Sequence, residues 1–420
     1  MSMNDTPSSD RVHIGFFGRR NAGKSSLVNA VTGQDLVIVS EVKGTTTDPV
    51  SKSMELLPIG PVLIIDTPGI DDEGTLGELR VKKAKRVLNK TDIAVLVVDA
   101  TIPLAEAENQ LISIFKEKNV PFIVVYNKSD LLLENSEKAD DDLNKKDFAF
   151  IYVSAKTGKN ITELKEMIAH SVNSDDPKMH IVGDLIKAGD VVVLVTPIDS
   201  AAPKGRLILP QQQTVRDVEE ADGIVMAATD KMYSASLQAL KKAPALVITD
   251  SQAFAKVSAE TPQDVPLTSF SILFARYKGF LDTAVTGVKT LDKLKGGSKV
   301  LICEGCTHHR QCDDIGTVKL PRWITEYSRG ETLSQKLSGT WEKSSSDIEF
   351  VFRSGGDFPE DISGYDMIVH CGGCMLNDRE MQFRQKCASD QNVPFTNYGT
   401  AIAHMQGILE RTLAPVKRHL

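Results

Sequence analysis

The stretch Gly18-Arg-Arg-Asn-Ala-Gly-Lys-Ser25 decides the fold of the first part of this chain. It follows the apolar run Val12–Phe17 and precedes a helical pattern that begins at Ser26. A Gly-x-x-x-x-Gly-Lys-Ser spacing between a strand and a helix is typical of a phosphate-binding loop, whose backbone N–H groups and helix N-terminus surround phosphate oxygens. We expect Lys24 to contact the β- and γ-phosphates and the Ser25 hydroxyl to bind Mg²⁺.

Three further turns follow predicted strands, in the order that a nucleotide site requires. Asp66-Thr-Pro-Gly69 offers a carboxylate for the Mg²⁺ shell and a glycine N–H for the γ-phosphate. Asn127-Lys-Ser-Asp130 offers a carboxylate that can accept from N1–H and the exocyclic amine of guanine, whereas adenine would leave it unpaired. Ser154-Ala-Lys156 is placed to contact the base from the other side. These turns predict GTP and GDP as ligands.

The predicted nucleotide-binding residues come from the phosphate loop and from the two turns on the guanine side. They are Gly18, Asn21, Ala22, Gly23, Lys24, Ser25, Ser26, Asn127, Lys128, Asp130, Ser154, Ala155 and Lys156.

Short apolar runs alternate with amphipathic stretches along the whole chain, which predicts an α/β protein with mostly parallel sheets. The predicted strands fall into three groups: Val12–Phe17, Val62–Asp66, Ile93–Asp99, Phe122–Asn127 and Phe150–Ser154; Val191–Thr196, Gly223–Ala227, Ala245–Thr249 and Leu267–Ile272; and Lys299–Cys303, Ile348–Phe352, Asp366–Cys371 and Val393–Asn397. Long helices are predicted over Leu281–Lys295 and Thr400–Thr412. No internal repeat is evident in the sequence.

The three groups predict three domains. Residues 11–172 are expected to form a P-loop GTPase domain, residues 181–280 an α/β scaffold or association domain, and residues 281–420 an α/β domain that carries the cysteines. Residues 1–10 are interpreted as a flexible tail and the polar, proline-containing stretch 173–180 as a linker.

Composition excludes several classes of partner. The formal net charge is -7, which argues against affinity for nucleic-acid backbones. No run of about 18 apolar residues predicts a membrane span, and the first residues lack the apolar stretch of a secretory signal. We therefore expect a cytoplasmic protein that binds neither membrane nor nucleic acid.

The cysteines form a second candidate site, since all six lie between Cys303 and Cys387. In a chain without an export signal such a cluster indicates metal binding or redox chemistry before disulfides. Cys303-Glu-Gly-Cys306-Thr-His308 ends one predicted strand and His370-Cys371-Gly-Gly-Cys374 ends another. Because ligands gather at the carboxyl ends of parallel strands, these two groups are expected to meet.

Three interpretations of this site compete. Four cysteines could bind zinc, but the two pairs lie much further apart in sequence than in zinc ribbons. Cys371 and Cys374 could form a redox dithiol, which leaves Cys306 and the histidines without a role. Cys306, Cys371 and Cys374 could bind a [4Fe–4S] cluster and leave its fourth iron open. Spacing alone supports zinc and the cluster equally, because both favour thiolates. Cys312 and Cys387 are interpreted as bystanders.

The nucleotide motifs resemble those of the translation-factor-related GTPases, in particular the branch that includes tRNA-modifying and ribosome-assembly GTPases. Gly44-Thr-Thr-Thr-Asp48 is similar to the switch of that branch, and the resemblance implies that Thr46 reaches Mg²⁺ when GTP is bound. Asn21 occupies the position that binds K⁺ in potassium-activated relatives, while Ile70 replaces the water-orienting glutamine of many GTPases. The resemblance implies slow, K⁺-stimulated hydrolysis, with Lys24, Thr46, Asp66 and Gly69 as catalytic residues. Asn21 could equally well only stabilise the loop.

Behind such a GTPase domain, Cys306-Thr-His308 and His370-Cys371-x-x-Cys374 resemble the maturation GTPases of [FeFe]-hydrogenase. The resemblance covers all three segments, although 61 residues between the two histidines (369 − 308) exceed the length expected of that family. It implies a [4Fe–4S] protein that acts as scaffold or carrier. Such a protein would receive a transient diiron precursor and pass it to the apo-[FeFe]-hydrogenase.

The same resemblance implies partners and ligands that the residues alone do not indicate. Two radical-SAM maturases would be further partners, and residues 181–280 would form a homodimer. For the fourth ligand of the cluster we rank Asp313 ahead of His308 and His370. The alternative function is a ribosome- or tRNA-associated GTPase with a structural zinc module, against which the acidic charge balance weighs.

Overall fold

A computed structural model describes residues 6–33, 50–57, 59–67, 69, 84–132, 147–172, 179–198, 207–306, 314–330 and 347–417. The chain forms two compact units, Met1–Asp176 and Pro177–Leu420. Within the described ranges no helix has the length and apolar character needed to cross a bilayer.

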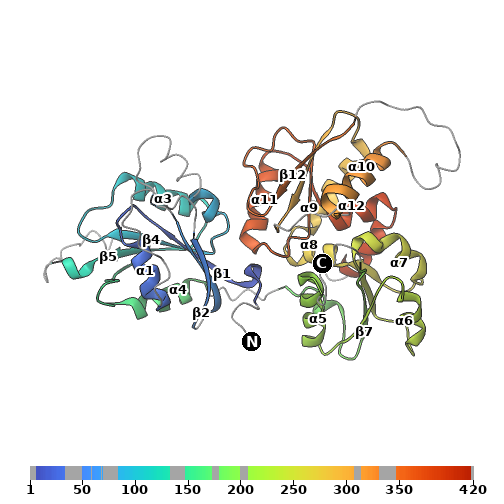
Figure 1. Cartoon of the computed structure of the whole chain (residues 1–420), viewed down its shortest axis with the longest axis horizontal. Helices are drawn as coiled ribbons and strands as arrows, with labels where there is room; N and C mark the ends of the chain where they lie inside the picture. The colour runs from blue at the N-terminus through green and yellow to red at the C-terminus, as the bar shows by residue number, and fades with distance from the viewer. Residues whose placement is uncertain are drawn as a thin grey trace. The chain divides into compact units, whose positions relative to one another are not determined.

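The first unit contains a six-stranded sheet in the order β2-β3-β1-β4-β5-β6. Its strands are β1 (Val12–Phe17), β2 (Val50–Leu56), β3 (Gly60–Asp66), β4 (Ile93–Asp99), β5 (Phe122–Asn127) and β6 (Ala149–Tyr152). Only β2 runs antiparallel to its neighbour. Helix α3 (Glu106–Glu117) covers one face, while α1 (Lys24–Thr32) and α4 (Ile161–Val172) cover the other (Figure 1).

The prediction of a mostly parallel P-loop domain is confirmed. Strands β1, β4 and β5 have the predicted bounds. Strand β2 was not predicted, because its sequence, Val-Ser-Lys-Ser-Met-Glu-Leu, mixes polar and apolar residues as an edge strand does. The parallel strands place their carboxyl ends on one edge of the sheet, where the predicted nucleotide turns follow them.

The second unit begins with a parallel sheet in the order β10-β9-β7-β8. Its elements are β7 (Val191–Val195), α5 (Leu209–Glu220), β8 (Ile224–Ala228), α6 (Tyr233–Ala239), β9 (Leu246–Thr249), α7 (Phe254–Glu260), β10 (Leu267–Ser269) and α8 (Phe270–Tyr277). The predicted strand Leu267–Ile272 is wrong beyond Ser269. The Ser269 hydroxyl accepts a hydrogen bond from Ile272 N at 3.2 Å and so caps α8, a start signal that the apolar run concealed.

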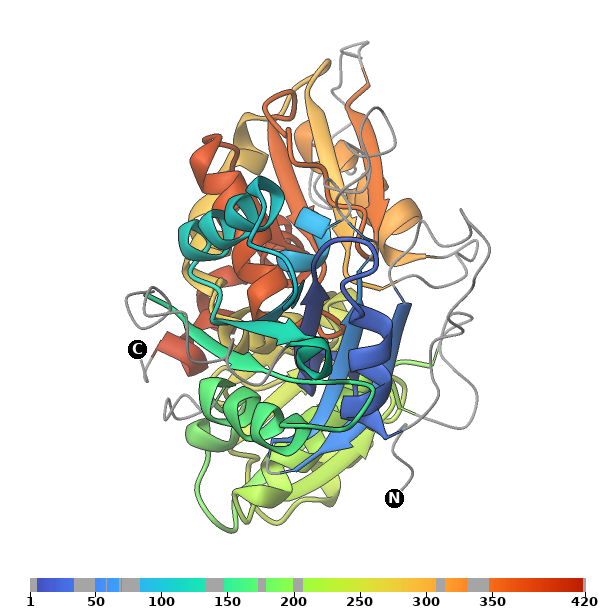
Figure 2. The ribbon, with the colours of Figure 1, turned by 90° about the vertical axis from the view of Figure 1, so that its left-hand side faces the viewer.

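A second parallel sheet follows in the order β12-β11-β13-β14, and Figure 2 shows its orange and red strands side by side. Its elements are α9 (Leu281–Gly287), β11 (Lys299–Glu304), α10 (Leu320–Ser328), β12 (Glu349–Ser354), β13 (Met367–His370), α11 (Asp378–Asp390), β14 (Phe395–Asn397), α12 (Tyr398–Met405) and α13 (Leu409–Lys417). The long predicted helices are wrong in extent. Residues Val288–Lys293 form a 3-10 turn after α9, and Gly407, with φ 69°, separates α12 from α13.

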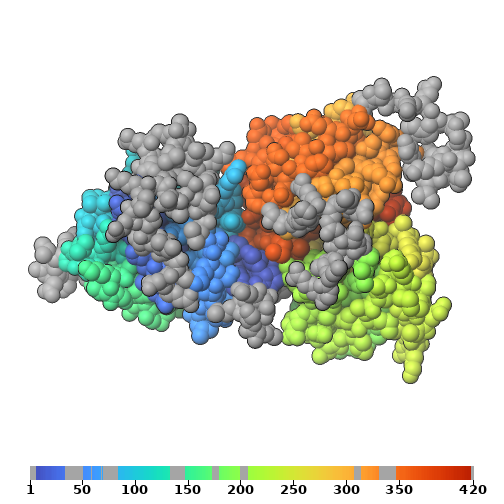
Figure 3. All heavy atoms as spheres, in the orientation of Figure 1, coloured from blue at the N-terminus to red at the C-terminus, as the bar shows by residue number. Residues whose placement is uncertain are grey.

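The two sheets of this unit have the same topology, because in each the first strand lies between the second and the third, and the fourth lies outside the third. The expectation of no internal repeat is therefore wrong at the level of structure. One hydrophobic core contains Val192 of β7, Val300 of β11 and Val416 of α13. In the space-filling view the yellow-green and orange atoms of the two halves lie directly against each other (Figure 3).

Candidate functional site

The phosphate loop has a backbone that few residues can adopt. Gly18, Asn21 and Gly23 have positive φ angles of 141°, 62° and 88°. A Cβ atom on Gly18 would lie 2.1 Å from the carbonyl oxygen of Val97 in β4, and one on Gly23 would lie 2.3 Å from the side-chain amide of Asn127. Glycine at both positions is therefore required for the loop to pass this close to β4 and β5.

Lys24 and Ser25 are held in place at the start of α1. The buried Lys24 ammonium donates to the carbonyl oxygens of Gly18 at 2.9 Å and Arg19 at 2.7 Å, so its charge lies inside the loop. Ser25 Oγ donates to Asp66 Oδ2 at 2.7 Å. This arrangement brings together the lysine, hydroxyl and carboxylate that the motifs predicted.

Asp66 has the properties of a residue that binds a cation. Its Oδ1 atom is buried and has no hydrogen-bond partner among the residues that the structure describes. Burial raises the pKa of Asp66, while the Ser25 hydrogen bond and the Lys24 charge act in the opposite direction. A buried acceptor without a donor is costly, and Mg²⁺ beside Ser25 and Asp66 would satisfy it. Thr46, the other predicted Mg²⁺ ligand, lies outside the described residues, as do the rest of the Gly44–Asp48 switch and Ile70.

Asn127 joins the phosphate loop to the guanine side of the site. Its side chain, 2% exposed, donates to Ala22 O at 3.0 Å and accepts from Ala155 N at 3.0 Å. Asp130 accepts from the hydroxyl of the buried Ser154 at 2.7 Å. The two guanine-side turns are thus in contact.

Two further predicted site residues, Lys128 and Gly69, lie at the same edge of the sheet. Lys128 donates to Asp99 Oδ2 at 2.6 Å; no motif marks Asp99, and sequence analysis missed it. A Cβ atom on Gly69 would lie 2.8 Å from Arg20 N, so this turn reaches the phosphate loop. Asn21, Ser26 and Lys156 are exposed.

The second candidate site lies where β11 and β13 end. These strands pair so that Cys303 lies opposite His370, which brings the segments of Cys306 and Cys371 together. Cys371 Sγ accepts hydrogen bonds from Gly305 N at 3.1 Å and Gly373 N at 3.4 Å. Backbone N–H groups directed at a sulfur stabilise a thiolate and are common around iron–sulfur clusters.

The three predicted cluster cysteines share one environment. Burial raises the pKa of Cys306 to about 12, and the negative charges of Cys371 and Glu304 act in the same direction. Burial likewise raises the pKa of Cys374, with contributions from Cys371 and Cys306. All three thiols thus lie in a buried environment that favours their protonated form.

No three His, Cys, Asp or Glu side chains of the described ranges converge as the ligands of one ion would. Cys303 is fully buried in the core, where burial raises its pKa to about 12. Cys387 lies on α11 with Sγ 3.3 Å from Glu360 O, in keeping with its interpretation as a bystander.

His370 is fully buried, and both of its ring nitrogens are engaged. Nε2 accepts from Arg384 Nη1 at 2.9 Å, so Nδ1 carries the proton and donates to Cys371 O at 2.8 Å. Burial and the neighbouring Arg384 charge lower the His370 pKa to about 3. To bind iron, His370 would first have to release Arg384. Sequence analysis missed Arg384, which is 1% exposed and also donates to Glu380 Oε1 at 2.6 Å.

Glu304 is a second residue that sequence analysis missed. It is 5% exposed at the end of β11, accepts from Tyr398 Oη at 3.3 Å, and raises the pKa of Cys371 by its charge. Its place within the motif Cys-Glu-Gly-Cys was the available signal. The other ligand candidates, His308 and Asp313, lie outside the described residues together with Cys312. Asp314 caps the following turn by accepting from Thr317 N at 2.7 Å.

Family models match three parts of the chain. Residues 181–279 match the hydrogen maturase F dimerization domain, and residues 282–415 match the hydrogen maturase F tetramerization domain. Residues 13–128 match the 50S ribosome-binding GTPase model.

Curated relatives match part of the chain. GTPase Der of Wolinella succinogenes is 34% identical over 166 residues, which cover 37% of this chain and 35% of that protein. The tRNA modification GTPase MnmE of Legionella pneumophila is 38% identical over 159 residues, or 37% of this chain and 33% of that protein. The chain thus spans about a third of the length of these two relatives. A solved structure of Aquifex aeolicus Era bound to GDP·AlF4⁻ matches with a TM-score of 0.36 and 21% identity, covering 52% of this chain and 92% of that one.

Proposed function

This chain belongs to the hydrogen maturase F family, and on that premise we propose that it is a GTP-hydrolysing [4Fe–4S] protein that serves as scaffold or carrier in [FeFe]-hydrogenase maturation. One observation carries the cluster assignment: Cys371 Sγ accepts two backbone N–H bonds beside the thiols of Cys306 and Cys374. The cluster, when bound, would supply an iron that is open to exchange.

The first unit supports GTP hydrolysis through residues already in position. Lys24 and a Mg²⁺ ion at Ser25 and Asp66 would neutralise the charge that develops on the γ-phosphoryl group. The Gly69 N–H would contact that group, and Thr46 would complete the Mg²⁺ shell. Asp130 would select guanine. Asn21 at the surface of the phosphate loop would bind K⁺, and Ile70 in place of glutamine would keep turnover slow.

The second unit supports a cluster because its thiols are buried and clustered. Iron binding displaces thiol protons, so a site with raised thiol pKa values stays neutral until metal arrives. Asp313 remains our preferred fourth ligand, followed by His308. The buried Glu304 carboxylate joins these candidates because its charge acts on Cys306 and Cys371. His370 ranks last, because Arg384 already occupies its Nε2 atom.

The proposal includes partners and a timing role for GTP. The apo-hydrogenase and two radical-SAM maturases would exchange the diiron cargo with this protein in the cytoplasm. Residues 181–279 would form a dimer, and residues 282–415 would assemble dimers into tetramers, as the names of the matching domains indicate. Binding and hydrolysis of GTP would then control the release of a partner.

Anaerobic reconstitution tests the cluster assignment. The full chain is incubated with iron and sulfide, analysed for both elements, reduced and examined by EPR. We expect about four irons per chain and the signal of a reduced [4Fe–4S] cluster. A protein that retains only zinc and stays EPR-silent would overturn the assignment and favour a GTPase with a structural zinc module. Activation of apo-hydrogenase in a maturation assay then tests the carrier role.

A further inference from the structure

The second unit consists of two copies of one fold unit: the first runs from β7 to α9 and the second from β11 to α13. The register of the paired strands shows which residues of the two copies correspond. In the first sheet Val195 pairs with Thr249, which pairs with Ser269. In the second sheet Cys303 pairs with His370, which pairs with Asn397. The bond that follows also repeats: Asp250 N donates to Val195 O at 3.2 Å, and Cys371 N donates to Cys303 O at 2.9 Å.

The turns before the first strands of the two copies repeat in detail. Gly189 and Gly297 have φ angles of 81° and 87°. Lys187 N donates to the side chain of Asp190 at 2.9 Å, and Lys295 N donates to the side chain of Ser298 at 3.2 Å. Both copies therefore enter their first strand through the same side-chain-supported turn.

From the fourth strand onward the copies correspond without a gap. Strand β14 and helices α12 and α13 each begin 128 residues after β10, α8 and α9 (397 − 269 for the helix caps). Identical residues include Val265 and Val393, Pro266 and Pro394, Thr268 and Thr396, Gly279 and Gly407, Leu281 and Leu409, and Val288 and Val416. Earlier loops differ in length, which explains why the sequence alone did not reveal the repeat.

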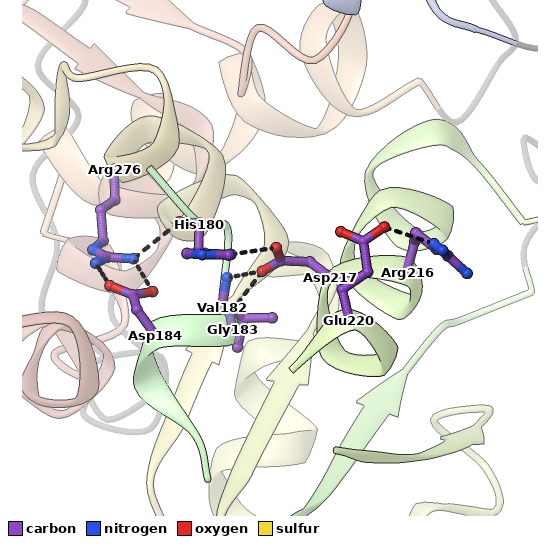
Figure 4. Close-up of polar contacts among 8 residues, drawn as sticks. All are labelled: His180, Val182, Gly183, Asp184, Arg216, Asp217, Glu220 and Arg276. Carbon is purple, nitrogen blue, oxygen red and sulfur yellow. Dashed lines mark hydrogen bonds and ion pairs between the residues drawn. The ribbon is translucent and has the colours of Figure 1, made fainter. Parts of the chain in front are cut away.

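An ion pair on α8 also repeats on α12. Figure 4 shows Arg276 of α8 bound to Asp184, with Arg276 Nη1 also donating to His180 O at 3.2 Å. The same view shows Asp217 accepting from Val182 N at 2.7 Å, a bond that holds the segment before β7 against α5. In the second copy the corresponding pair is His404 with Asp292, at 2.8 Å. In each copy the helix after the fourth strand is thus bonded to the segment that precedes the first strand of the same copy.

The copies exchange their last helices. Helix α9 of the first copy packs on β14 of the second, where Thr396 Oγ1 donates to Ala284 O at 2.8 Å. Helix α13 of the second copy packs on β10 of the first, and its Arg411 donates to the carbonyl oxygens of Ser258 and Thr261 at 2.9 Å each. The starts of α8 and α12 meet where Gly399 N donates to Ser271 Oγ at 3.1 Å.

Residues that the two copies have in common are explained by their common fold. Residues that differ between the copies are therefore candidates for a role in the cysteine site, which only the second copy has. Cys371 and Cys374 correspond to Asp250 and Ala253, and Cys306 corresponds to Ile198. One further difference concerns the residue that follows the helix after the fourth strand. It is Lys278 after α8 in the first copy and Gln406 after α12 in the second. The Lys278 side chain is 2% exposed, whereas Gln406 is exposed.

Lys278 lies beside the cysteine site. Its ammonium donates to Asp378 Oδ1 at 2.9 Å, and its charge lowers the pKa of Cys374. A Cβ atom on Gly372, inside the Cys371–Cys374 loop, would lie 3.4 Å from Phe274 Cβ of α8. The loop therefore rests on a helix of the other copy. A buried ammonium is costly unless negative charge or π density surrounds it. The partners of Lys278 among the described residues are Asp378, whose side chain is 67% exposed, and the Tyr277 ring, whose centroid lies 5.1 Å from Lys278 Nζ.

We propose that Lys278, contributed by the first copy, is a positioning residue of the cluster site whose buried ammonium balances the charge of the Cys306, Cys371 and Cys374 thiolates. This inference rests on the proposed cluster function. Reduction adds a negative charge to the cluster, so a nearby cation stabilises the reduced state. Asp378 opposes that effect through its own charge.

Redox titration of the reconstituted full chain tests the proposal through two variants of opposite sign. Lys278→Met should disfavour reduction by about tenfold, a shift of about 59 mV to lower midpoint potential for one electron. Asp378→Asn should shift the midpoint in the other direction. Gln406→Met, the matched change in the second copy, should leave it unchanged, and Lys278→Arg should retain the wild-type value.

The outcomes separate the two proposals. A wild-type chain that takes up no cluster overturns both. A wild-type cluster whose midpoint is the same in Lys278→Met overturns only the role of Lys278. If Lys278→Met fails to fold or to bind iron, Asp378→Asn decides, since an unchanged or lowered midpoint there contradicts the proposal. General destabilisation cannot produce two shifts of opposite sign.

Discussion

The nucleotide site and the cysteine site lie in comparable places, at the carboxyl ends of parallel strands, but they are prepared for ligands of opposite charge. Around the phosphate loop, Lys24 bonds to two carbonyl oxygens, and Asn127 bonds to both Ala22 and Ala155. The cysteine site instead contains thiols that burial keeps protonated. An anion can enter the nucleotide site without rearranging it, whereas under the proposed function iron would first have to displace the thiol protons of the cysteine site.

Removal of one thiol is expected to have the largest effect and tests whether the two sites bind their ligands independently. Cys371→Ala deletes the sulfur that accepts from Gly305 and Gly373, so we expect complete loss of the cluster and unchanged GTP affinity. Iron analysis after anaerobic reconstitution and fluorescent nucleotide titration measure the two effects. Cys387→Ala on α11 is the matched control and should bind iron normally. Full iron content in Cys371→Ala would contradict the assignment of the site.

A substitution in the nucleotide site should lower the affinity for GTP and leave iron binding unchanged. Asp130→Ala removes the acceptor of two guanine hydrogen bonds, and we expect GTP affinity to fall about 100- to 10,000-fold because charge-assisted bonds contribute about 1.5–3 kcal/mol each. Iron content should not change. Asp147→Ala serves as the control, since that side chain is 99% exposed. Equal affinity of Asp130→Ala for GTP and ATP would support guanine selection, and unchanged GTP affinity would refute it.

A smaller effect tests whether the nucleotide site is built before its ligand arrives. Asn127→Ala breaks the bonds to Ala22 and Ala155, and we expect about a tenfold loss of nucleotide affinity with about 1–3 kcal/mol less stability of the nucleotide-free protein. Calorimetric nucleotide titration and thermal unfolding without ligand provide the measurements. Asn109→Ala, an exposed change on α3, is the control. Lost affinity with unaltered stability would show that Asn127 acts only through the nucleotide.

The smallest expected effect concerns K⁺. If Asn21 binds K⁺ beside the phosphates, GTP turnover should be several-fold faster in KCl than in NaCl, and Asn21→Ala should remove the difference. Steady-state phosphate release in the two salts at equal ionic strength measures this. Equal turnover of the wild-type chain in both salts leaves Asn21 as a residue that only stabilises the loop.

The nucleotide site could be predicted from the sequence because each of its parts is a short contiguous motif after an apolar strand. Asp66, Asn127, Asp130 and Ser154 lie in the contacts that the motifs imply. Strands β1, β4 and β5 even have the predicted bounds. Local sequence is sufficient where one segment supplies both the strand and the ligand-binding turn.

The cysteine site was only half predictable, because its supporting residues come from distant segments. The Cys-x-x-Cys spacing showed the thiols, but Arg384 reaches His370 from the middle of α11 and Lys278 comes from the other copy. The starts of α8 and α12 were missed because each follows a strand of three residues directly. The repeat itself escaped notice because loop lengths and polar residues differ between the copies.

The exchange of α9 and α13 has a consequence for the order in which the protein is made. Synthesis proceeds from the N-terminus, so β10 leaves the ribosome well before α13, which packs on it. The first unit can fold while translation continues. The second cannot close its core until Leu413 and Val416 have emerged, and both are fully buried. The second unit therefore completes its core only at the end of translation, after the first unit has emerged.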